Sequence, residues 1–316
     1  MSSGISQSSV GLNQTAGGRD GPAIEADART TLRKRIVAVL NTGSGSCDAN
    51  SAGEAKAVFD EAGLSHAKVV SAGPDDIEKA LDDAVANSEV LVVLGGDGTI
   101  AAAAARCGGS GSLLIPLPGG TMNMLPKALY GERSWREALA HTLADPKVHD
   151  VGGAKADDRP FFCAAILGAP SLWAKAREAG RKGHLIEAVQ RSITAARRSS
   201  DEALDYDFGE GETGSAQAVA VICPTISKAM SQDERTLEAA ALDPETASAM
   251  FGLAFHAVFD DWRNDVSVSL AQVKTVRVTG HGEVPVLLDG ESVEMGRMVT
   301  ITFVPLAFRA LVPAER

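Results

Sequence analysis

The chain has 316 residues, of which 45% are hydrophobic, 22% are charged and 4% are aromatic, with a formal net charge of −11. This length predicts about two domains with packed cores, and the hydrophobic share excludes wholesale disorder. The acidic balance argues against nucleic acid as a partner.

Residues 1–30 are rich in serine, glycine, glutamine and asparagine and show no periodicity, which predicts a flexible tail. They also lack the basic start and apolar stretch of a signal peptide. The longest apolar candidate for a membrane span, 161–174, is interrupted by Gly168 and Pro170. Four scattered cysteines without a Cys-x-x-Cys pair indicate reduced thiols, so we expect a cytoplasmic protein.

Apolar strand patterns alternate with helical patterns from residue 35 to residue 117. The expected strands cover 35–40, 66–70, 89–94 and 113–117, and the expected helices cover 52–62, 75–87 and 100–106. Strands that alternate with helices of about 12 residues indicate right-handed βαβ units and a parallel sheet. We therefore expect an α/β domain over residues 31–150.

The pattern changes after about residue 150. Short alternating segments predict strands at 216–223, 252–259, 266–270, 273–279, 284–288 and 298–304. Such spacing is typical of an antiparallel, β-rich domain, which we place at residues 151–304. A long helical segment at about 171–198 interrupts it.

The strongest local signal is the turn Gly95-Gly96-Asp97-Gly98-Thr99, which follows a buried strand and precedes a helix. Its glycines let the backbone approach a ligand, and its amides with the helix N-terminus suit a phosphate. Thr99 can cap the helix, whereas Asp97 repels phosphate unless a metal or hydroxyl lies between them. The alternative is an ordinary tight turn with Asp97 as a cap.

Two further polar turns follow neighbouring strands. They are Asn41 to Ser46 and Pro118-Gly119-Gly120-Thr121-Met122-Asn123. Three such loops at one edge of a sheet predict a nucleotide crevice. The chain has no Gly-x-x-x-x-Gly-Lys-Ser/Thr sequence, and the first loop lacks the third glycine of a dinucleotide fingerprint, so it is neither a P-loop nor a Rossmann fingerprint.

The two glycine-rich turns, in this order, resemble the catalytic domain of diacylglycerol, sphingosine and ceramide kinases, and the bacterial soluble lipid kinases are the most similar type. Asn41 with Ser44 and Gly45 is similar to the family's Asn-Pro-x-Ser-Gly loop. Leu288-Asp289-Gly290-Glu291 is similar to its Asp-Gly-Glu. The closing Val304-Pro305-Leu306-Ala307-Phe308 resembles a final strand region that returns to the first domain, so residues 305–316 are expected to complete that domain.

The resemblance implies a kinase with ATP and Mg²⁺ as cofactors and a lipid hydroxyl as acceptor. It implies that Asp289 accepts the hydroxyl proton and that Glu291 assists through the metal or through orientation. Taken alone, Asp-Gly is also the signal for an ordinary hairpin turn. The residues expected to bind nucleotide are Asn41, Ser44, Gly45, Gly95, Gly96, Asp97, Gly98, Thr99, Gly120, Thr121 and Asn123.

The chain also departs from the family. Ile100-Ala101-Ala102 replaces the x-Asn-Glu that usually continues the glycine turn, and an acidic stretch used around magnesium is reduced to something like Leu242-Asp243-Pro244. The resemblance therefore does not identify the metal ligands or the lipid that is phosphorylated. An NAD kinase, or a nucleotide-binding regulatory module without catalysis, remains an alternative.

The segment 171–200 carries seven basic and two acidic residues with apolar positions at helical spacing. A basic amphipathic helix can lie on an anionic membrane, so peripheral contact with the inner membrane surface is one interpretation. An ordinary solvated helix with one face in the core is the other.

Overall fold

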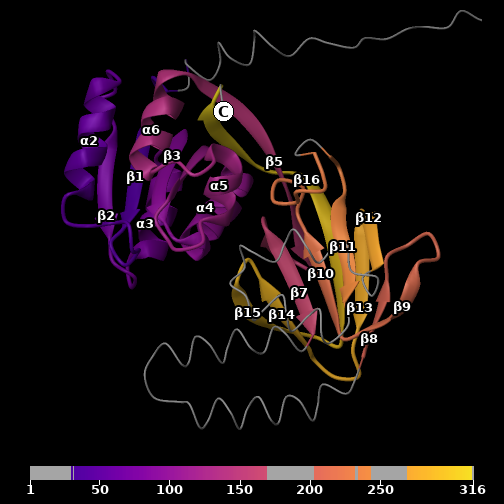
Figure 1. Cartoon of the computed structure of the whole chain (residues 1–316). Helices are drawn as coiled ribbons and strands as arrows, with labels where there is room; N and C mark the ends of the chain where they lie inside the picture. Colours follow the sequence, from indigo (N-terminus) through magenta and orange to yellow (C-terminus); the bar gives the residue numbers. More distant parts are fainter. Residues whose placement is uncertain (1–29, 31, 169–202, 232–233, 243–268, 315–316) are drawn as a thin grey trace, which may run out of the picture.

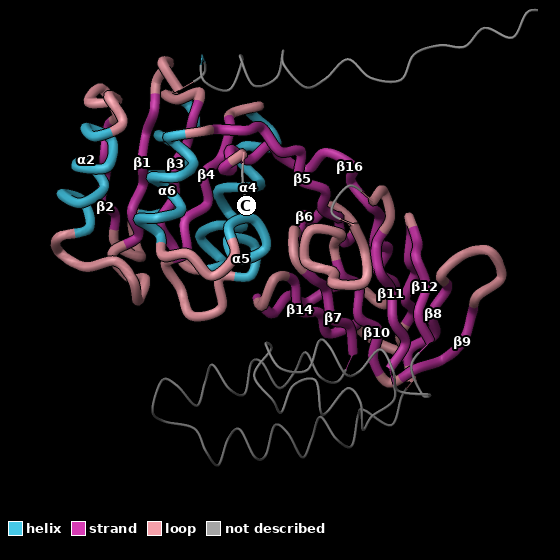
Figure 2. The backbone as a smooth tube through the Cα atoms, turned by 45° about the horizontal axis from the view of Figure 1, so that its top comes forward, coloured by secondary structure: helices cyan, strands magenta, loops and turns pink. Residues whose placement is uncertain are grey.

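The computed structural model describes residues 30, 32–168, 203–231, 234–242 and 269–314 of the chain. The predicted tail lies outside the described residues except for residue 30. The basic segment 171–200 and the expected strand at 252–259 lie wholly outside them. The described elements form two parts that lie beside one another, and the helices occupy the N-terminal part (Figures 1 and 2).

The N-terminal part is an α/β domain built on parallel strands. Its strands are β1 (Ile36–Asn41), β2 (Lys68–Ala72), β3 (Val90–Gly95) and β4 (Leu113–Pro118). Its helices are α2 (Ser51–Glu61), α3 (Ile77–Ala86), α4 (Asp97–Ser110), α5 (Met124–Tyr130) and α6 (Trp135–Ala144).

The strand order in this domain is β2-β1-β3-β4, with all three pairings parallel. Helices α2 and α6 pack together, and α3 packs with α4, so helices cover both faces of the sheet (Figure 1). Because both faces are covered, the central strand β3 reads as a continuous apolar run and every residue of it is buried.

The C-terminal part is a sandwich of two mainly antiparallel sheets. The first sheet contains β6 (Arg159–Phe161), β8 (Leu204–Asp207), β9 (Thr213–Ala216) and β13 (Thr275–Thr279). The second has the order β12-β11-β10-β7-β14-β15. Its strands are β7 (Ala164–Gly168), β10 (Ala218–Ile222), β11 (Leu237–Leu242), β12 (Ser269–Val273), β14 (Val284–Leu288) and β15 (Glu291–Met295).

Alternation decides which side of each outer strand faces the core. In β13, Val276 and Val278 are buried, whereas Thr275 and Arg277 between and beside them are exposed. The inward side chains of both sheets form one cluster that includes Val221 of β10. This packing agrees with the expected antiparallel, β-rich second half.

Two long strands belong to both parts. They are β5 (Pro146–Ala156) and β16 (Met298–Pro313), which pair antiparallel along almost their full length. The pairing is interrupted between Val304 and Phe308, and beyond this irregularity β16 also pairs parallel to β4. The expected boundary at residue 150 falls inside β5, and we propose the domain division at this crossing.

The sequence correctly predicts strands β1 to β4 and helices α2, α3 and α4 to within a few residues, but it misses α5 and α6. Among the C-terminal strands it misses β5, β6, β7, β8, β9, β11 and β15. In β5, Gly152-Gly153 interrupts the apolar pattern, and β7 and β11 are short, uniformly apolar or alanine-rich strands. Within the described residues, no helix is long and apolar enough to cross a membrane.

Candidate active site

The three polar loops predicted from the sequence follow β1, β3 and β4 and are joined to one another. The Asn41 side-chain amide donates to the Thr99 hydroxyl at 2.9 Å, and the Ser46 amide donates to the Gly119 carbonyl at 2.9 Å. The Gly119 amide donates to the Gly95 carbonyl, also at 2.9 Å. Because the sheet order reverses between β1 and β3, the loops lie where parallel sheets bind ligands.

Close backbone contact explains why the two turns are rich in glycine. A Cβ on Gly119 would lie 2.8 Å from the Gly95 nitrogen, and a Cβ on Gly120 would lie 2.8 Å from the Gly96 Cα. These neighbours are backbone atoms and cannot move aside like a side chain. The two turns therefore stack directly on each other only if both positions lack a side chain.

Asp97 uses its carboxylate to hold the second turn. Its Oδ2 accepts the Asn123 amide at 3.0 Å and its Oδ1 accepts the Met124 amide at 2.7 Å, at the start of α5. Asn123 takes the left-handed conformation with φ 53°, and its side chain exchanges hydrogen bonds with the Gly120 amide and carbonyl at 2.7 and 2.8 Å. The negative charge of Asp97 is thus directed at amides of α5.

The start of α4 differs from expectation in one respect. Gly96 is the N-cap residue and Asp97 begins the helix, so Thr99 lies within the first turn instead of capping it. Its hydroxyl instead accepts the hydrogen bond from Asn41. The first amides of this 14-residue helix have no acceptor within their own helix, which leaves donors and a positive dipole end available to a phosphate.

The remaining nucleotide-side residues frame these loops. Ser44 donates its hydroxyl to the Asn41 carbonyl at 2.8 Å and is half-buried. Gly45 is exposed and a Cβ there would meet nothing within 4 Å, and Thr121 is exposed. The three residues lie on the loops as expected, but of these only Ser44 has a defined polar contact among the described residues.

The Asp289-Gly290 turn joins β14 to β15. Both residues have positive φ, 48° and 91°, as a two-residue hairpin loop requires. The Asp289 carboxylate accepts three successive backbone amides: Oδ2 from Phe162 at 2.7 Å, and Oδ1 from Cys163 at 2.7 Å and Ala164 at 3.0 Å. The hairpin interpretation is correct, and the same turn brings this carboxylate to the N-terminal domain.

The protonation of Asp289 reflects opposing influences. The pKa of Asp289 is raised from 3.8 to about 6, because the effect of burial outweighs the three backbone amides, which lower it, and the Asp97 carboxylate raises it further. A carboxyl with a pKa near 6 is mostly ionised at neutral pH yet basic enough to accept a proton.

Glu291 lies on the opposite side of the same hairpin and faces Gly98. A Cβ on Gly98 would lie 2.5 Å from Glu291 Oε1, so the carboxylate sits directly against the glycine turn. No hydrogen bond or ion pair to the Glu291 carboxylate is present among the described residues. Glu291 is therefore an exposed carboxylate at the first turn of α4.

The described residues contain no group of three or more His, Cys, Asp or Glu side chains placed to hold a metal ion. Asp97 and Asp289 already accept backbone amides, which leaves Glu291 as the carboxylate with unused oxygens. Mg²⁺ often binds proteins through one or two carboxylates together with substrate phosphates and water. This donor set fits Mg²⁺ that is bound mainly by a nucleotide, and it does not form a metal site on its own.

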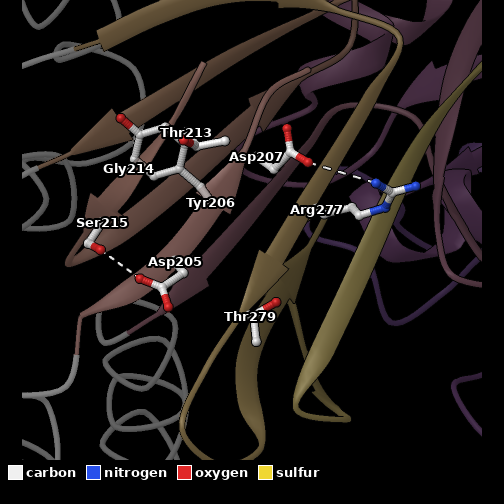
Figure 3. Close-up of a pocket in the computed structure, with 8 residues that line it drawn as sticks. All are labelled: Asp205, Tyr206, Asp207, Thr213, Gly214, Ser215, Arg277 and Thr279. Carbon is white, nitrogen blue, oxygen red and sulfur yellow. Dashed lines mark hydrogen bonds and ion pairs between the residues drawn. The ribbon is translucent and has the colours of Figure 1, made fainter. Parts of the chain in front are cut away.

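A hollow lies away from the loops, on the outer side of the first sandwich sheet (Figure 3). It has a volume of about 470 Å³ and is lined by strands β8, β9 and β13. Asp205 accepts the Ser215 hydroxyl at 2.6 Å, and Asp207 pairs with Arg277 at 3.8 Å. Its polar groups pair with one another, as on an ordinary solvated sheet surface, and we assign it no ligand.

Sequence reasoning missed one part of the site, residues 162–164. Their amides, not their side chains, hold Asp289, and backbone donors leave no signal in residue type.

Comparison with known proteins gives a family match for the N-terminal part of the chain. Residues 35–154 match the family model described as diacylglycerol kinase catalytic domain. No curated protein sequence matches the chain.

Solved structures share the fold over most of the chain. A diacylglycerol kinase from Bacillus anthracis str. Sterne has 16% identity and a TM-score of 0.65, covering 89% of this chain and 97% of that one. Two structures of a putative diacylglycerol kinase from the same organism have 17% identity, TM-scores of 0.65 and 0.66, and cover 89% of this chain and 97% and 98% of theirs. Residues 35–154 thus match the family that the motifs predict, and these structures share the two-part fold.

Proposed function

We propose that the protein is an ATP-dependent lipid kinase, because residues 35–154 match the family model of the diacylglycerol kinase catalytic domain. In this proposal it transfers the γ-phosphoryl group to a hydroxyl of a membrane lipid of the diacylglycerol, ceramide or sphingoid-base type. The supporting observation is the hairpin of the second domain, which carries Asp289 and Glu291 to the glycine-rich turns of the first. Phosphoryl transfer requires hydrogen-bond donors to the phosphates together with a carboxylate beside the acceptor hydroxyl.

We assign the nucleotide to the loops after β1, β3 and β4. The free amides at the start of α4 would donate to phosphate oxygens. Asp97 turns its carboxylate toward α5, so its charge is directed away from the phosphates. Asn41 and Asn123 would hold the loops in shape, since their side chains are bonded to Thr99 and Gly120.

We assign the acceptor hydroxyl to Asp289. Oδ2 accepts one backbone amide and keeps a lone pair free, and that oxygen would take the hydroxyl proton. The acceptor oxygen then forms the new bond to the γ-phosphorus while the bond to the leaving ADP oxygen breaks. When Mg²⁺ is bound with the nucleotide, it neutralises phosphate charge, and Glu291 is the residue that would contact it or orient the phosphates.

One assay tests this assignment. Purified protein is incubated with labelled ATP and Mg²⁺ in four separate reactions, which contain diacylglycerol, ceramide, a sphingoid base or NAD as the acceptor. We expect label in one lipid class. Transfer to NAD alone would replace the lipid assignment with an NAD kinase activity, and transfer to none would favour a nucleotide-binding regulatory module.

The same proposal includes a cytoplasmic location with peripheral contact at an anionic membrane. The support is the charge of residues 171–200, which lie outside the described residues. A lipid kinase has to reach its substrate at the bilayer surface, and a basic amphipathic segment is one means of doing so.

A further inference from the structure

Phe162 joins the two domains at the point where the chain leaves β6. Phe161, the last residue of β6, is fully buried in the sandwich core. The next residue, Phe162, is 2% exposed and buried in the core of the N-terminal domain. The chain therefore passes from one core into the other between two neighbouring phenylalanines, and the side chain of Phe162 is anchored in the N-terminal domain.

The backbone of Phe162 contacts the proposed base directly. Its amide donates at 2.7 Å to Oδ2 of Asp289, the oxygen to which we assign the hydroxyl proton. The next two amides donate to Oδ1, and the Asp289 amide donates to the Ala164 carbonyl at 2.9 Å. Four hydrogen bonds thus fix the Asp289 turn to residues 162–164, so the carboxylate moves when this backbone moves.

The ring of Phe162 contacts both of the long strands that the domains share. It meets Phe308 of β16 edge to face, with ring centroids 5.4 Å apart and planes at 86°, and Phe308 is also 2% exposed. On β5, a Cβ on Gly153 would lie 3.2 Å from Cδ1 of Phe162, so the glycine leaves space for the ring. The ring therefore attaches the amides that hold Asp289 to the two strands that cross between the domains (Figure 1).

Helix α4 packs on the same part of β16. A Cβ on Gly108, near the end of α4, would overlap the Ala307 carbonyl oxygen and would lie 4.0 Å from Cβ of Phe308. The helix is continuous over 14 residues, and its first amides are the donors that we assign to the phosphates. Phe308 thus adjoins both the helix that would bind the phosphates and the ring that anchors the base.

We propose that Phe162 is a positioning residue, whose contact with Phe308 sets the place of the Asp289 carboxylate relative to the start of α4. The inference rests on the proposed kinase function for its catalytic consequence. The ring is buried in the core and acts only through the backbone amides of residues 162–164. The carboxylate must meet the acceptor hydroxyl beside the γ-phosphorus, and a displacement of about 1 Å can lower the rate by roughly 100-fold.

The test makes the same change at three positions, Phe162→Leu, Phe308→Leu and Phe161→Leu. Leucine keeps each site apolar but removes the ring and leaves a small cavity. Phe161→Leu is the matched control, because Phe161 is the adjacent residue and is also buried, yet it packs in the sandwich core and pairs with Ala154 of β5.

A split between kcat and KM distinguishes positioning from a merely structural role. We expect Phe162→Leu and Phe308→Leu each to lower kcat about tenfold while the KM for ATP changes less than about twofold, since a misplaced base affects the transition state. Phe161→Leu should leave kcat within about twofold of wild type. A loss in Phe161→Leu as large as in Phe162→Leu, or a rise in the KM for ATP with kcat unchanged, would overturn the proposal.

The double variant Phe162→Leu/Phe308→Leu shows whether the two rings act through one contact. If they do, the second change should lower kcat little further once the first has removed the contact. Losses that multiply to about 100-fold in the double variant would show that the rings act independently, and the proposal would be wrong.

Hydrogen exchange tests the same contact without turnover. The amides of residues 162–164 should exchange faster in Phe308→Leu than in wild type, whereas in Phe161→Leu they should change no more than the other strand amides of the sandwich. Unchanged exchange at 162–164 in Phe308→Leu would refute the positioning role even in an active enzyme. If exchange responds as expected but the wild-type protein phosphorylates no lipid, the proposed function fails and the positioning of Asp289 by Phe162 stands.

Discussion

Replacement of Asp289 by asparagine tests the proposed base with little disturbance of the backbone. Position 289 has φ 48°, and asparagine tolerates this left-handed conformation as well as aspartate does. The new side chain can keep two of the three backbone donors on its oxygen, but its NH₂ group faces the Phe162 amide. We expect turnover to fall by about 100-fold or more, since an amide cannot accept the hydroxyl proton, while nucleotide binding is retained.

The same variant makes a prediction for stability. The pKa of Asp289 is about 6 in the folded chain against 3.8 ordinarily, so the folded state holds this proton more tightly. Wild-type stability is therefore lost as the pH rises from about 4 through 6, by at most roughly 3 kcal/mol. The asparagine in the variant does not titrate, so Asp289→Asn gains stability relative to wild type over that range. The amide facing Phe162 lowers the stability of the variant by about 1–3 kcal/mol at every pH.

The measurement is urea unfolding at pH 4 and pH 7.5, with kinase turnover and nucleotide titration on the same samples. Asp157→Asn is the matched control, because Asp157 also has positive φ, 50°, and accepts one backbone amide, from Thr300, on an exposed turn. Two results would refute the reasoning. One is an Asp289→Asn enzyme that keeps a tenth or more of wild-type turnover. The other is a free energy of unfolding of Asp289→Asn that does not rise relative to that of wild type between pH 4 and pH 7.5.

Three further predictions concern the turns and the membrane. Gly119→Ala should lower the free energy of unfolding by about 1–3 kcal/mol and weaken nucleotide binding, because its Cβ meets the Gly95 backbone. The control Gly109→Ala on α4 has open space around the new Cβ and should raise the free energy of unfolding by about 0.5–1 kcal/mol in the same urea titration. Gly98→Ala should displace Glu291 and reduce kcat; if Gly98→Ala in a Glu291→Ala background causes a further loss as large as in wild type, Glu291 is not the group displaced. Reversing the charges of Arg197 and Arg198 should reduce co-sedimentation with anionic vesicles and leave turnover on detergent-dispersed lipid unchanged; unaltered co-sedimentation would end the membrane interpretation.

The sequence predicted those parts of the fold that depend on local patterns. Continuous apolar runs identified β1, β3 and β4, and glycine with a polar neighbour marked the loops that follow them. Parallel strands place their carboxyl ends together, so the meeting of Asn41, Thr99 and Gly119 followed from the order of elements.

The rest depended on contacts between distant segments. The sequence could not show that Asp97 would turn toward Met124, nor that the amides after Phe161 would hold Asp289, because backbone donors are the same in every residue. Thr99 was expected at a helix cap for its residue type, yet Gly96 has the extended backbone that the cap position requires. Tertiary placement, not local preference, decided these details.

The shared strand β16 also bears on how the chain folds as it is made. The edge of β4 pairs with Arg309 and Ala310, roughly 200 residues later in the sequence. Until those residues leave the ribosome, the first domain presents an unpaired parallel edge while the sandwich is still being synthesised. Open strand edges attract other strands, so the first domain is exposed to mispairing until synthesis reaches this segment, and a fragment ending before it would carry that edge permanently.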